Sequence, residues 1–479
     1  MTGMEVDRRT VLDGLSVAAV GATGRVAASS GTDGSATATT TPGDSTQASF
    51  RQTAKLRPGD GNGFQNFGSS VALDGPTALV GAYRGDDDQG NSVGTAHVIG
   101  RDGNTWTRQA ELTAVDADTG MWFGSSVALD GETALVGAPL EQDPNGRAAG
   151  AAYAFVRAGD EWTQQAKLVP EDGDDGDSFG WSVALDGDTA LVGAEGDEDP
   201  HGEHGGSAYV FRRRNGEWRQ QAKLVPDDGS AWSRFGGSVA LSRDTALVGA
   251  DGANTAYVFG REGGNWTEQT TLTPGGGDGG RFGIATALSG SGETALVGAY
   301  TASPKGSASG AAYVFGRSEG RWTRQAKLTA TDGDESDSFG NSVAVTDETA
   351  LVGADQDEDP NGEEAGSVYV FEHMDSGWAQ WDKLAADDGD RQDGFGSAVA
   401  TTGTTALVGA NVDEGAGGAA VGSAYVFERG GESGTDPTTD SGTDPGSATA
   451  ADGPGFGPVP ALLAVGIGAY RRYRTCDGE

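Results

Sequence analysis

The stretch 179-FGWSVALDGDTALVGA-194, followed by 207-SAYVFRRR-214 and 217-EWRQQAKL-224, decides the fold. Its first half holds two apolar runs joined by Asp-Gly, a dipeptide that indicates a two-residue β-hairpin. An acidic loop leads to the third run, and Asn-Gly joins the third run to the fourth. The stretch therefore predicts four short antiparallel strands.

The same phrase occurs seven times along the chain. Its Phe-Gly pairs begin at Phe67, Phe123, Phe179, Phe235, Phe282, Phe339 and Phe395, which gives steps of 56, 56, 56, 47, 57 and 56 residues. A fixed period near fifty residues marks a repeat array, and four strands are the content of one propeller blade. We therefore predict an all-β fold, a seven-bladed β-propeller of four-stranded blades over residues 50–430.

The N-terminal strand is predicted to close the ring. The seventh repeat has no Trp-containing strand after Phe427, whereas FRQTAKL at 50–56 matches WTRQAEL at 106–112, with Phe in place of Trp. Phe50 precedes Phe67 by 17 residues, the step found between the repeat Trp and the next Phe-Gly elsewhere. Residues 50–56 should therefore form the outer strand of the last blade.

Phe-Gly followed by Gly-Ala, with Gly-Ala-Pro intact at Gly137-Ala138-Pro139, resembles the FG-GAP repeat of integrin α-subunit propellers. The resemblance implies a propeller with the Phe-Gly strand innermost and a role in extracellular recognition or adhesion. In integrins the loop between the first two strands carries an Asp-x-Asp-x-Asp calcium site. Here that loop is a tight Asp-Gly hairpin, as at Asp186-Gly187, which cannot surround Ca²⁺ with six to eight oxygens. We expect integrin-type calcium sites to be absent.

Acidic residues cluster in other loops. Because strand direction alternates, the loops between the second and third strands share one face, here called the loop face, with the blade-to-blade loops; the Asp-Gly hairpins share the opposite hairpin face. An Asp-x-Asp-x-x-Asp pattern recurs in three blade-to-blade loops, at Asp172, Asp174 and Asp177, at Asp332, Asp334 and Asp337, and at Asp388, Asp390 and Asp393. One interpretation is weak sites for divalent cations such as Ca²⁺. The other is a solvated acidic surface.

Composition favours the acidic-surface interpretation. Acidic residues outnumber basic ones by 71 to 32, and the formal net charge is −39. Such a surface repels nucleic acid and anionic membranes, so we expect no nucleic-acid partner. Molar salt, with a Debye length of about 3 Å, would screen the self-repulsion. The balance resembles that of proteins from salt-loving archaea.

Three tryptophans lie outside the repeat register. Trp122, Trp181 and Trp232 fall within three residues of a Phe-Gly pair in blades two, three and four. Trp is enriched at binding hot spots, so these residues are candidate ligand contacts; the alternative is extra packing near the ring's centre. Blade four also has a shortened second–third loop, which could widen access to them.

The two ends predict export and anchoring. Residues 1–28, with Arg8-Arg9 before a weakly apolar run, resemble a twin-arginine signal peptide, and residues 29–49 form a predicted disordered linker. Residues 431–452 are a Ser/Thr/Asp/Pro-rich predicted stalk. Residues 453–479 resemble a PGF-CTERM sorting signal, with Pro454-Gly455-Phe456, a short apolar run and a basic tail. That resemblance implies processing by an archaeosortase and a lipid anchor; a plain membrane helix is the alternative.

These patterns favour a surface-anchored module that binds an extracellular protein or a glycan. The alternative is a structural protein of the cell envelope without a discrete ligand, and a third hypothesis is a propeller enzyme, because propellers host many functions. The sequence contains no phosphate-binding glycine loop before a helix and no paired catalytic carboxylates that stand out from the acidic background. We therefore predict that the chain is not an enzyme.

Overall fold

The computed structural model describes residues 49–59, 65–87, 90–142, 144–276, 279–358, 360–414 and 420–430. All of them belong to the compact unit Gln47–Glu479. The predicted signal and sorting segments, with Arg8, Arg9 and Pro454-Gly455-Phe456, lie outside the described residues. None of the described residues forms a helix that could cross a membrane.

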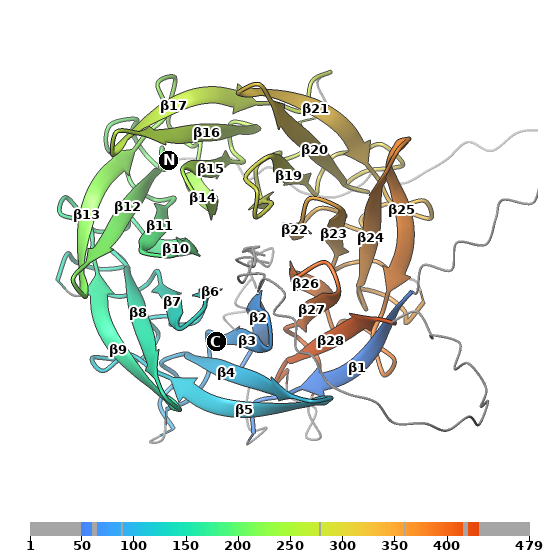
Figure 1. Ribbon diagram of the computed structural model, residues 1–479, viewed down its shortest axis with the longest axis horizontal. Helices are drawn as coiled ribbons and strands as arrows, with labels where there is room; N and C mark the ends of the chain where they lie inside the picture. Colours follow the sequence, from blue (N-terminus) through green and yellow to red (C-terminus); the bar gives the residue numbers. More distant parts are fainter. Residues whose placement is uncertain are drawn as a thin grey trace, which may run out of the picture. The chain divides into compact units, whose positions relative to one another are not determined.

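The described residues form seven antiparallel sheets of four strands each, arranged as blades around an axis (Figure 1). Blade one contains β2 (Phe67–Asp74), β3 (Thr77–Ala82), β4 (Thr95–Asp102) and β5 (Thr105–Leu112). Blade two contains β6 (Ser126–Asp130), β7 (Thr133–Ala138), β8 (Ala151–Ala158) and β9 (Glu161–Leu168). Blade three contains β10 (Phe179–Asp186), β11 (Thr189–Ala194), β12 (Ser207–Arg214) and β13 (Glu217–Leu224).

The remaining blades repeat this order. Blade four contains β14 (Phe235–Ser242), β15 (Thr245–Ala250), β16 (Thr255–Glu262) and β17 (Asn265–Leu272). Blade five contains β18 (Thr286–Leu288), β19 (Thr294–Ala299), β20 (Ala311–Ser318) and β21 (Arg321–Leu328). Blade six contains β22 (Val343–Val345), β23 (Thr349–Ala354), β24 (Ser367–Met374) and β25 (Gly377–Leu384). Blade seven contains β26 (Phe395–Thr401), β27 (Thr405–Ala410) and β28 (Ser423–Arg429).

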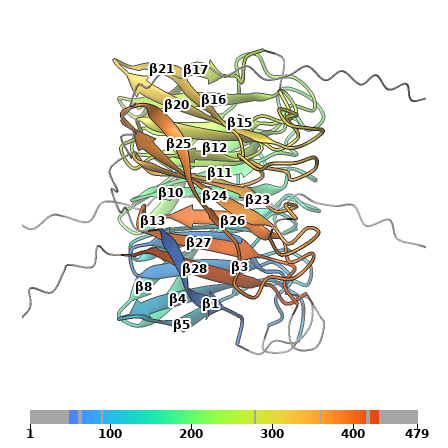
Figure 2. The ribbon, with the colours of Figure 1, turned by 90° about the vertical axis from the view of Figure 1, so that its right-hand side faces the viewer.

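The predicted ring closure is confirmed. The N-terminal strand β1 (Phe50–Leu56) pairs antiparallel with β28 and completes the seventh sheet. Figure 1 shows β1 at the outer edge of that blade, beside β28, with the Phe-Gly strands of all blades innermost. Seen from the side in Figure 2, the strands run between the two faces of the propeller.

Each blade has the same core. In blade three, the ring of Phe179 packs edge-on against Tyr209 at 5.5 Å and against Phe211 at 5.8 Å between ring centroids. The Phe of Phe-Gly is thereby buried under the Tyr-x-Phe of the third strand, and the arrangement recurs from blade two to blade seven. The regular distance in the sequence between Phe-Gly and Tyr-x-Phe therefore reflects one aromatic contact that is repeated in each of these blades.

Glycine lets neighbouring blades approach closely. The glycine of each Gly-Ala faces the backbone carbonyl of the Phe-Gly glycine in the next blade, and a Cβ there would lie 1.9–2.2 Å from that oxygen. The Phe-Gly glycines have φ between 85° and 98° and lie against the first residue of the preceding blade's third strand. Ser182 Oγ of blade three also donates to the Gly236 carbonyl of blade four at 2.8 Å.

The fifth and sixth blades depart from the pattern at their innermost strands. β18 and β22 have three residues each, against eight in β10. In blade five, the hairpin is lengthened to Ser289-Gly290-Ser291-Gly292, where the Ser289 hydroxyl accepts the Thr294 N–H. This insertion accounts for the longer step between Phe-Gly and Gly-Ala in the fifth repeat.

Replacing a Phe-Gly glycine should destabilise the ring for two reasons: the residue has a left-handed backbone conformation, and its new Cβ would collide with the preceding blade. In Gly180→Ala, the new Cβ would lie 2.2 Å from the Ala151 carbonyl at a φ of 90°. Gly216→Ala is the matched control, since Gly216 has a similar φ of 83° and nothing within 4 Å. We expect Gly180→Ala to melt roughly 4 °C or more below the control in scanning calorimetry. Equal melting temperatures would refute the close-contact argument.

Removing the closing strand should open the ring. A chain that begins at residue 57 lacks β1 and leaves the edge of β28 unpaired, whereas a chain that begins at Gln47 retains it. We expect the shorter chain to melt at a clearly lower temperature and to aggregate more readily, because an open sheet edge can pair with other chains. Identical melting curves for the two chains would show that β1 does not fasten the ring.

Candidate functional site

The residues around the axis on the loop face form the candidate site, and we call this region the axial rim. Phe-Gly lies there, at the start of the innermost strand or just before it, and the second strand ends there with Gly-Ala. The residue after each Gly-Ala therefore faces the rim. Across the seven blades these residues are Tyr83, Pro139, Glu195, Asp251, Tyr300, Asp355 and Asn411.

The residue before each Phe-Gly also belongs to the rim. It adopts a left-handed backbone conformation in every blade, although it is glycine only in blade seven. The six others are Asn66, Trp122, Ser178, Arg234, Arg281 and Ser338, with φ between 53° and 60°. Such a conformation is costly for residues with a Cβ, and strained residues of this kind gather at functional sites.

Blades three to five carry a charged network at the rim. Asp251, which is 4% exposed, accepts a hydrogen bond from Arg281 Nε at 2.6 Å. Arg234 Nη1 lies 3.9 Å from the same carboxylate oxygen of Asp251. Arg281 Nη1 in turn donates to the Tyr300 hydroxyl at 3.3 Å. Blades four and five are thereby linked, and only these two blades have arginine before Phe-Gly.

Glu195 is the second carboxylate of this network. A Cβ on Gly237 would lie 3.3 Å from Glu195 Oε2 and 3.8 Å from Asp251 Oδ1, so both carboxylates face the same glycine. Burial raises the pKa of Glu195 to about 7; the charge of Asp251 acts in the same direction, while Arg234 and Arg281 oppose it. Near neutral pH this carboxyl can therefore either donate or accept a hydrogen bond.

Buried polar atoms without a partner lie at an equivalent repeat position. Asn341 occupies in blade six the place of Gly237 in blade four, two residues after the Phe, and is 1% exposed. Neither its amide oxygen nor its amide nitrogen has a hydrogen-bond partner among the described residues, and the same holds for the indole N–H of Trp181 at this position in blade three. Such groups favour a polar ligand or bound water.

The three off-register tryptophans occupy different environments. Trp122 and Trp181 are half-buried, and the Trp122 ring lies edge-on to Tyr83 at 5.6 Å. Trp232 is 52% exposed and lies against the His204 ring at 4.9 Å. Trp232 therefore presents an aromatic surface to solvent, two residues from Arg234 of the network. The shortened second–third loop of blade four, between β15 and β16, is the four residues Asp251–Asn254.

The aspartates of the Asp-x-Asp-x-x-Asp loops have separate tasks. In blade three, Lys223 Nζ lies 2.8 Å from Asp172 Oδ2 and 2.9 Å from Asp197 Oδ2. Asp177 instead accepts the backbone N–H of Asp174 at 2.7 Å, and the Asp174 side chain is exposed. Lys383 bridges Asp332 and Asp357 in the same way, and Lys55 bridges Asp388 and Asp413. Asp337 and Asp393 likewise accept the N–H groups of Asp334 and Asp390.

Lysine thus supplies a positive charge where the sequence suggested a metal. Among the described residues, no group of three or more His, Cys, Asp or Glu side chains is placed to hold a metal ion. Calcium binding by these loops stays a prediction. A signal for the lysine pairing was present in the sequence, because five of the six lysines, Lys55, Lys167, Lys223, Lys327 and Lys383, share one repeat position.

The two classes of aspartate have opposite pKa shifts. Burial alone would raise the pKa of Asp172, but the hydrogen bond and charge of Lys223 outweigh it and hold that pKa below its usual range. Burial raises the pKa of Asp177 to about 6; the charge of Asp197 adds to this, and the Asp174 N–H opposes it. Burial also raises the pKa values of Asp337 and Asp393 to about 6, and the charges of Asp357 and Asp413 add to the two shifts.

The FG-GAP repeat model matches seven segments, at residues 50–99, 106–155, 162–211, 218–259, 266–315, 322–371 and 378–427. These segments cover most of the chain, which therefore belongs to the FG-GAP repeat family. No curated protein matches the sequence.

Solved propellers are similar in fold. The periplasmic gluconolactonase PpgL of Pseudomonas aeruginosa is 17% identical, with a TM-score of 0.44 over 67% of this chain and 86% of that chain. A putative 6-phosphogluconolactonase of Bacteroides fragilis is 12% identical, with a TM-score of 0.47 over 73% of this chain and 98% of that chain. At these values the likeness carries no argument for a shared activity.

The prediction that the chain is not an enzyme is corrected only to this extent: solved lactonases share the propeller fold, so the fold does not exclude an enzyme. The prediction relied on the absence of linear catalytic motifs. A propeller assembles its axial residues from several blades, as with Glu195, Asp251 and Arg281, so an axial site leaves no linear motif in the sequence. Absence of such motifs therefore does not exclude catalysis.

Asp177→Asn should remove part of the pH dependence of stability. The pKa of Asp177 in the folded protein, about 6, exceeds the ordinary value of 3.8, so the native state binds the proton more tightly than the unfolded state does. The contribution of Asp177 to the free energy of unfolding therefore falls as pH rises from 4 to 6. Asn mimics the protonated form, so we expect the variant to melt roughly 1–3 °C above the wild type at pH 7.5 and to match it near pH 4.

Calorimetry at pH 4, 5, 6 and 7.5 in molar salt would measure this difference. Asp174→Asn is the control, since it removes the same charge from an exposed side chain of the same loop. A stabilisation by Asp177→Asn that is equal at all four pH values would contradict the assignment.

Proposed function

We propose that this propeller is a binding module that takes an extracellular protein or a glycan at the axial rim of its loop face. The observation that carries the proposal is the charged network around Asp251, which joins blades four and five and faces the same glycine as Glu195 of blade three. The FG-GAP repeats explain the blades and their closure, but they do not require charged residues at these rim positions. The rim is therefore where the chain departs from its own repeat.

The rim combines the kinds of group that polar ligands need. Arg234 offers a planar donor beside Arg281, which Asp251 and Tyr300 hold in place, and Glu195 can accept or donate near neutral pH. Trp232 with His204 provides an exposed aromatic surface beside them. Aromatic faces next to fixed polar groups suit both sugar rings and peptide side chains. This combination supports recognition of a hydroxylated or mixed-charge ligand.

Display at the cell surface is part of the proposal. It is supported by the twin-arginine-like segment with Arg8-Arg9 and by the Pro454-Gly455-Phe456 segment that resembles an archaeosortase signal. The usual extracellular role of FG-GAP propellers supports it as well. In this proposal the chain is exported, anchored at its C-terminus through the membrane, and adhesive.

Changing Trp232 should weaken ligand binding while leaving the fold intact, because its side chain is half exposed. We expect Trp232→Ala and Arg234→Gln each to reduce binding at least tenfold, the loss typical of a hot-spot contact. Met374→Ala is the control, since Met374 is also an exposed apolar residue, at 39%, but lies at the hairpin face.

The binding assay is a glycan array together with capture from cell-envelope extract, followed by titration of whatever the wild type retains. Equal retention by Trp232→Ala, Arg234→Gln and the control would place the ligand elsewhere. Retention of nothing by the wild type would favour the alternative of an envelope structural protein without a discrete ligand.

A further inference from the structure

The outer strand of blade four begins with Asn265-Trp266-Thr267, the only Asn-x-Ser or Asn-x-Thr triplet in the 479 residues. Such a triplet, with any residue but Pro in the middle, is the acceptor sequence for N-linked glycans. Its Trp-Thr belongs to the repeat, since blades one, two and five carry Trp-Thr at the same place. Its asparagine does not, because the equivalent residues are Ser49, Thr105, Glu161, Glu217, Arg321 and Gly377. One departure from the repeat therefore completes the triplet.

Strand alternation turns the asparagine and the threonine of this triplet outward together. Successive side chains of a strand point to opposite sides, and in β17 Asn265 and Thr267 are exposed while Trp266 between them is half-buried. Trp266 packs against the hydrophobic core that blades three and four share. The two groups that define the acceptor triplet thus face solvent in the folded ring.

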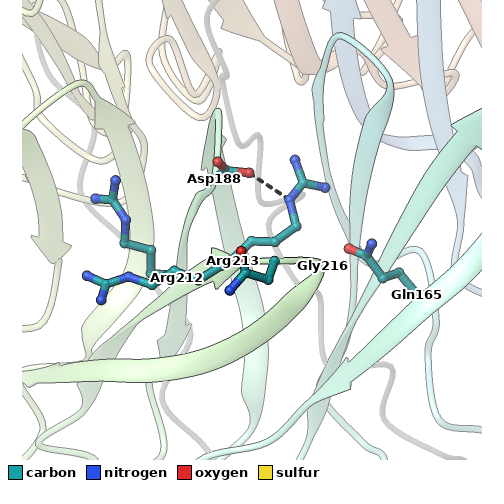
Figure 3. Close-up of a pocket in the computed structure, with 7 residues that line it drawn as sticks. Gln165, Asp188, Arg212, Arg213 and Gly216 are labelled. Carbon is teal, nitrogen blue, oxygen red and sulfur yellow. Dashed lines mark hydrogen bonds and ion pairs between the residues drawn. The ribbon is translucent and has the colours of Figure 1, made fainter.

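A side-chain pair of blade four fixes this orientation. Arg261 Nε donates to Asp244 at 2.6 Å, and the Arg261 guanidinium lies over the Trp266 ring at 5.5 Å. Figure 3 shows the equivalent pair of blade three, in which Arg213 donates to Asp188. The start of β17 is therefore held as in a regular blade, and only the residue at its first position differs.

The two exposed side chains are available to an enzyme. Within the ranges that the structure describes, neither the Asn265 amide nor the Thr267 hydroxyl forms a hydrogen bond. The turn before them is Gly263-Gly264, and a Cβ on either glycine would have nothing within 4 Å. There is thus open space beside Asn265 for a bulky substituent.

The triplet also lies where the sheet opens most easily. β17 is the outermost strand of its sheet, at the circumference of the ring (Figure 1), and pairs on one side only, with β16. Asn265 forms the last pair of that register, opposite Glu262. Terminal pairs open locally at little cost in free energy, so an enzyme can take up the triplet while the ring stays closed.

We propose that Asn265 is an N-glycosylation site of the exported chain, an inference that rests on the export included in the proposed function. The donor is a lipid-linked oligosaccharide whose first sugar is bound to phosphate. Asn265 Nδ2 forms a bond to the anomeric carbon of that sugar and loses a proton, while the bond from this carbon to the phosphate oxygen breaks and its electron pair leaves with the phosphate. The β16–β17 turn lies on the hairpin face, so the glycan leaves the axial rim uncovered.

Mass spectrometry of the full chain recovered from the surface of its native cells tests the proposal. We expect the peptide that contains Asn265 to carry one glycan, and Asn265→Gln and Thr267→Ala to lose it completely. Thr267→Ser keeps the triplet and should keep the glycan. Asn104→Gln is the matched control that should also keep it, since Asn104 is exposed in the equivalent turn of blade one but begins no acceptor triplet.

Moving the triplet to another blade tests the geometry. Glu161→Asn completes an acceptor triplet with Trp162 and Thr163 at the equivalent start of β9, where residues 161 and 163 are both exposed. We expect this variant to carry a second glycan. Melting curves of all variants check that the ring remains folded.

A second measurement does not depend on export. The purified, folded full chain is incubated with an archaeal oligosaccharyltransferase and its lipid-linked oligosaccharide, and the wild type and Thr267→Ser should each gain one glycan, whereas Asn265→Gln should gain none. An unmodified Asn265 on the chain recovered from the cell surface, or a glycan that persists in Asn265→Gln, would overturn the proposal. A chain found only inside the cell would instead refute surface display, and lack of transfer in the purified reaction would then overturn the glycosylation site as well.

Discussion

The contact between two glycines at each blade boundary is the constraint on which the rest of the propeller depends. The carbonyl of the Gly in Phe-Gly lies so close to the Gly of Gly-Ala in the preceding blade that a Cβ would meet it at about 2 Å. The last boundary repeats the first, since Gly409 of blade seven meets the carbonyl of Gly68 in blade one. The glycines of this seam cannot be replaced by larger residues, so the repeats differ from one another mainly on the loop face and the hairpin face.

The fold was predictable from the sequence because its determinants are local and recurrent. Phe-Gly, Gly-Ala and Tyr-x-Phe record one packing arrangement at fixed distances, and the match of residues 50–56 to the other outer strands located the closing strand. The short innermost strands β18 and β22 were not predicted, because strand length depends on pairing that the Phe-Gly spacing does not specify.

The candidate site was harder to predict because its members come from different blades. Asp251 and Arg281 are 30 residues apart in sequence, and Lys223 and Asp172 are 51 apart, yet each pair makes direct contact. Sequence reasoning placed the loop aspartates together as possible calcium ligands, whereas the structure divides them between lysine pairing and turn formation. The overlooked signal becomes visible when equivalent positions of the seven repeats are compared. It consists of the lysines that share one position and of the varied residues after Gly-Ala.

The charges of the loop face are therefore more ordered than composition suggests. Asp197, Asp357 and Asp413 are buried, and each meets both a lysine and the hydroxyl of the repeat tyrosine. Because these acids are compensated within the blade, they do not explain why arginines interrupt the repeat at the rim. There, Arg234 and Arg281 both lie against the Asp251 carboxylate. The rim departures, Glu195, Asp251, Arg234 and Arg281, each lie two residues from a glycine of the seam, so the contact that closes the ring also fixes the position of the candidate site.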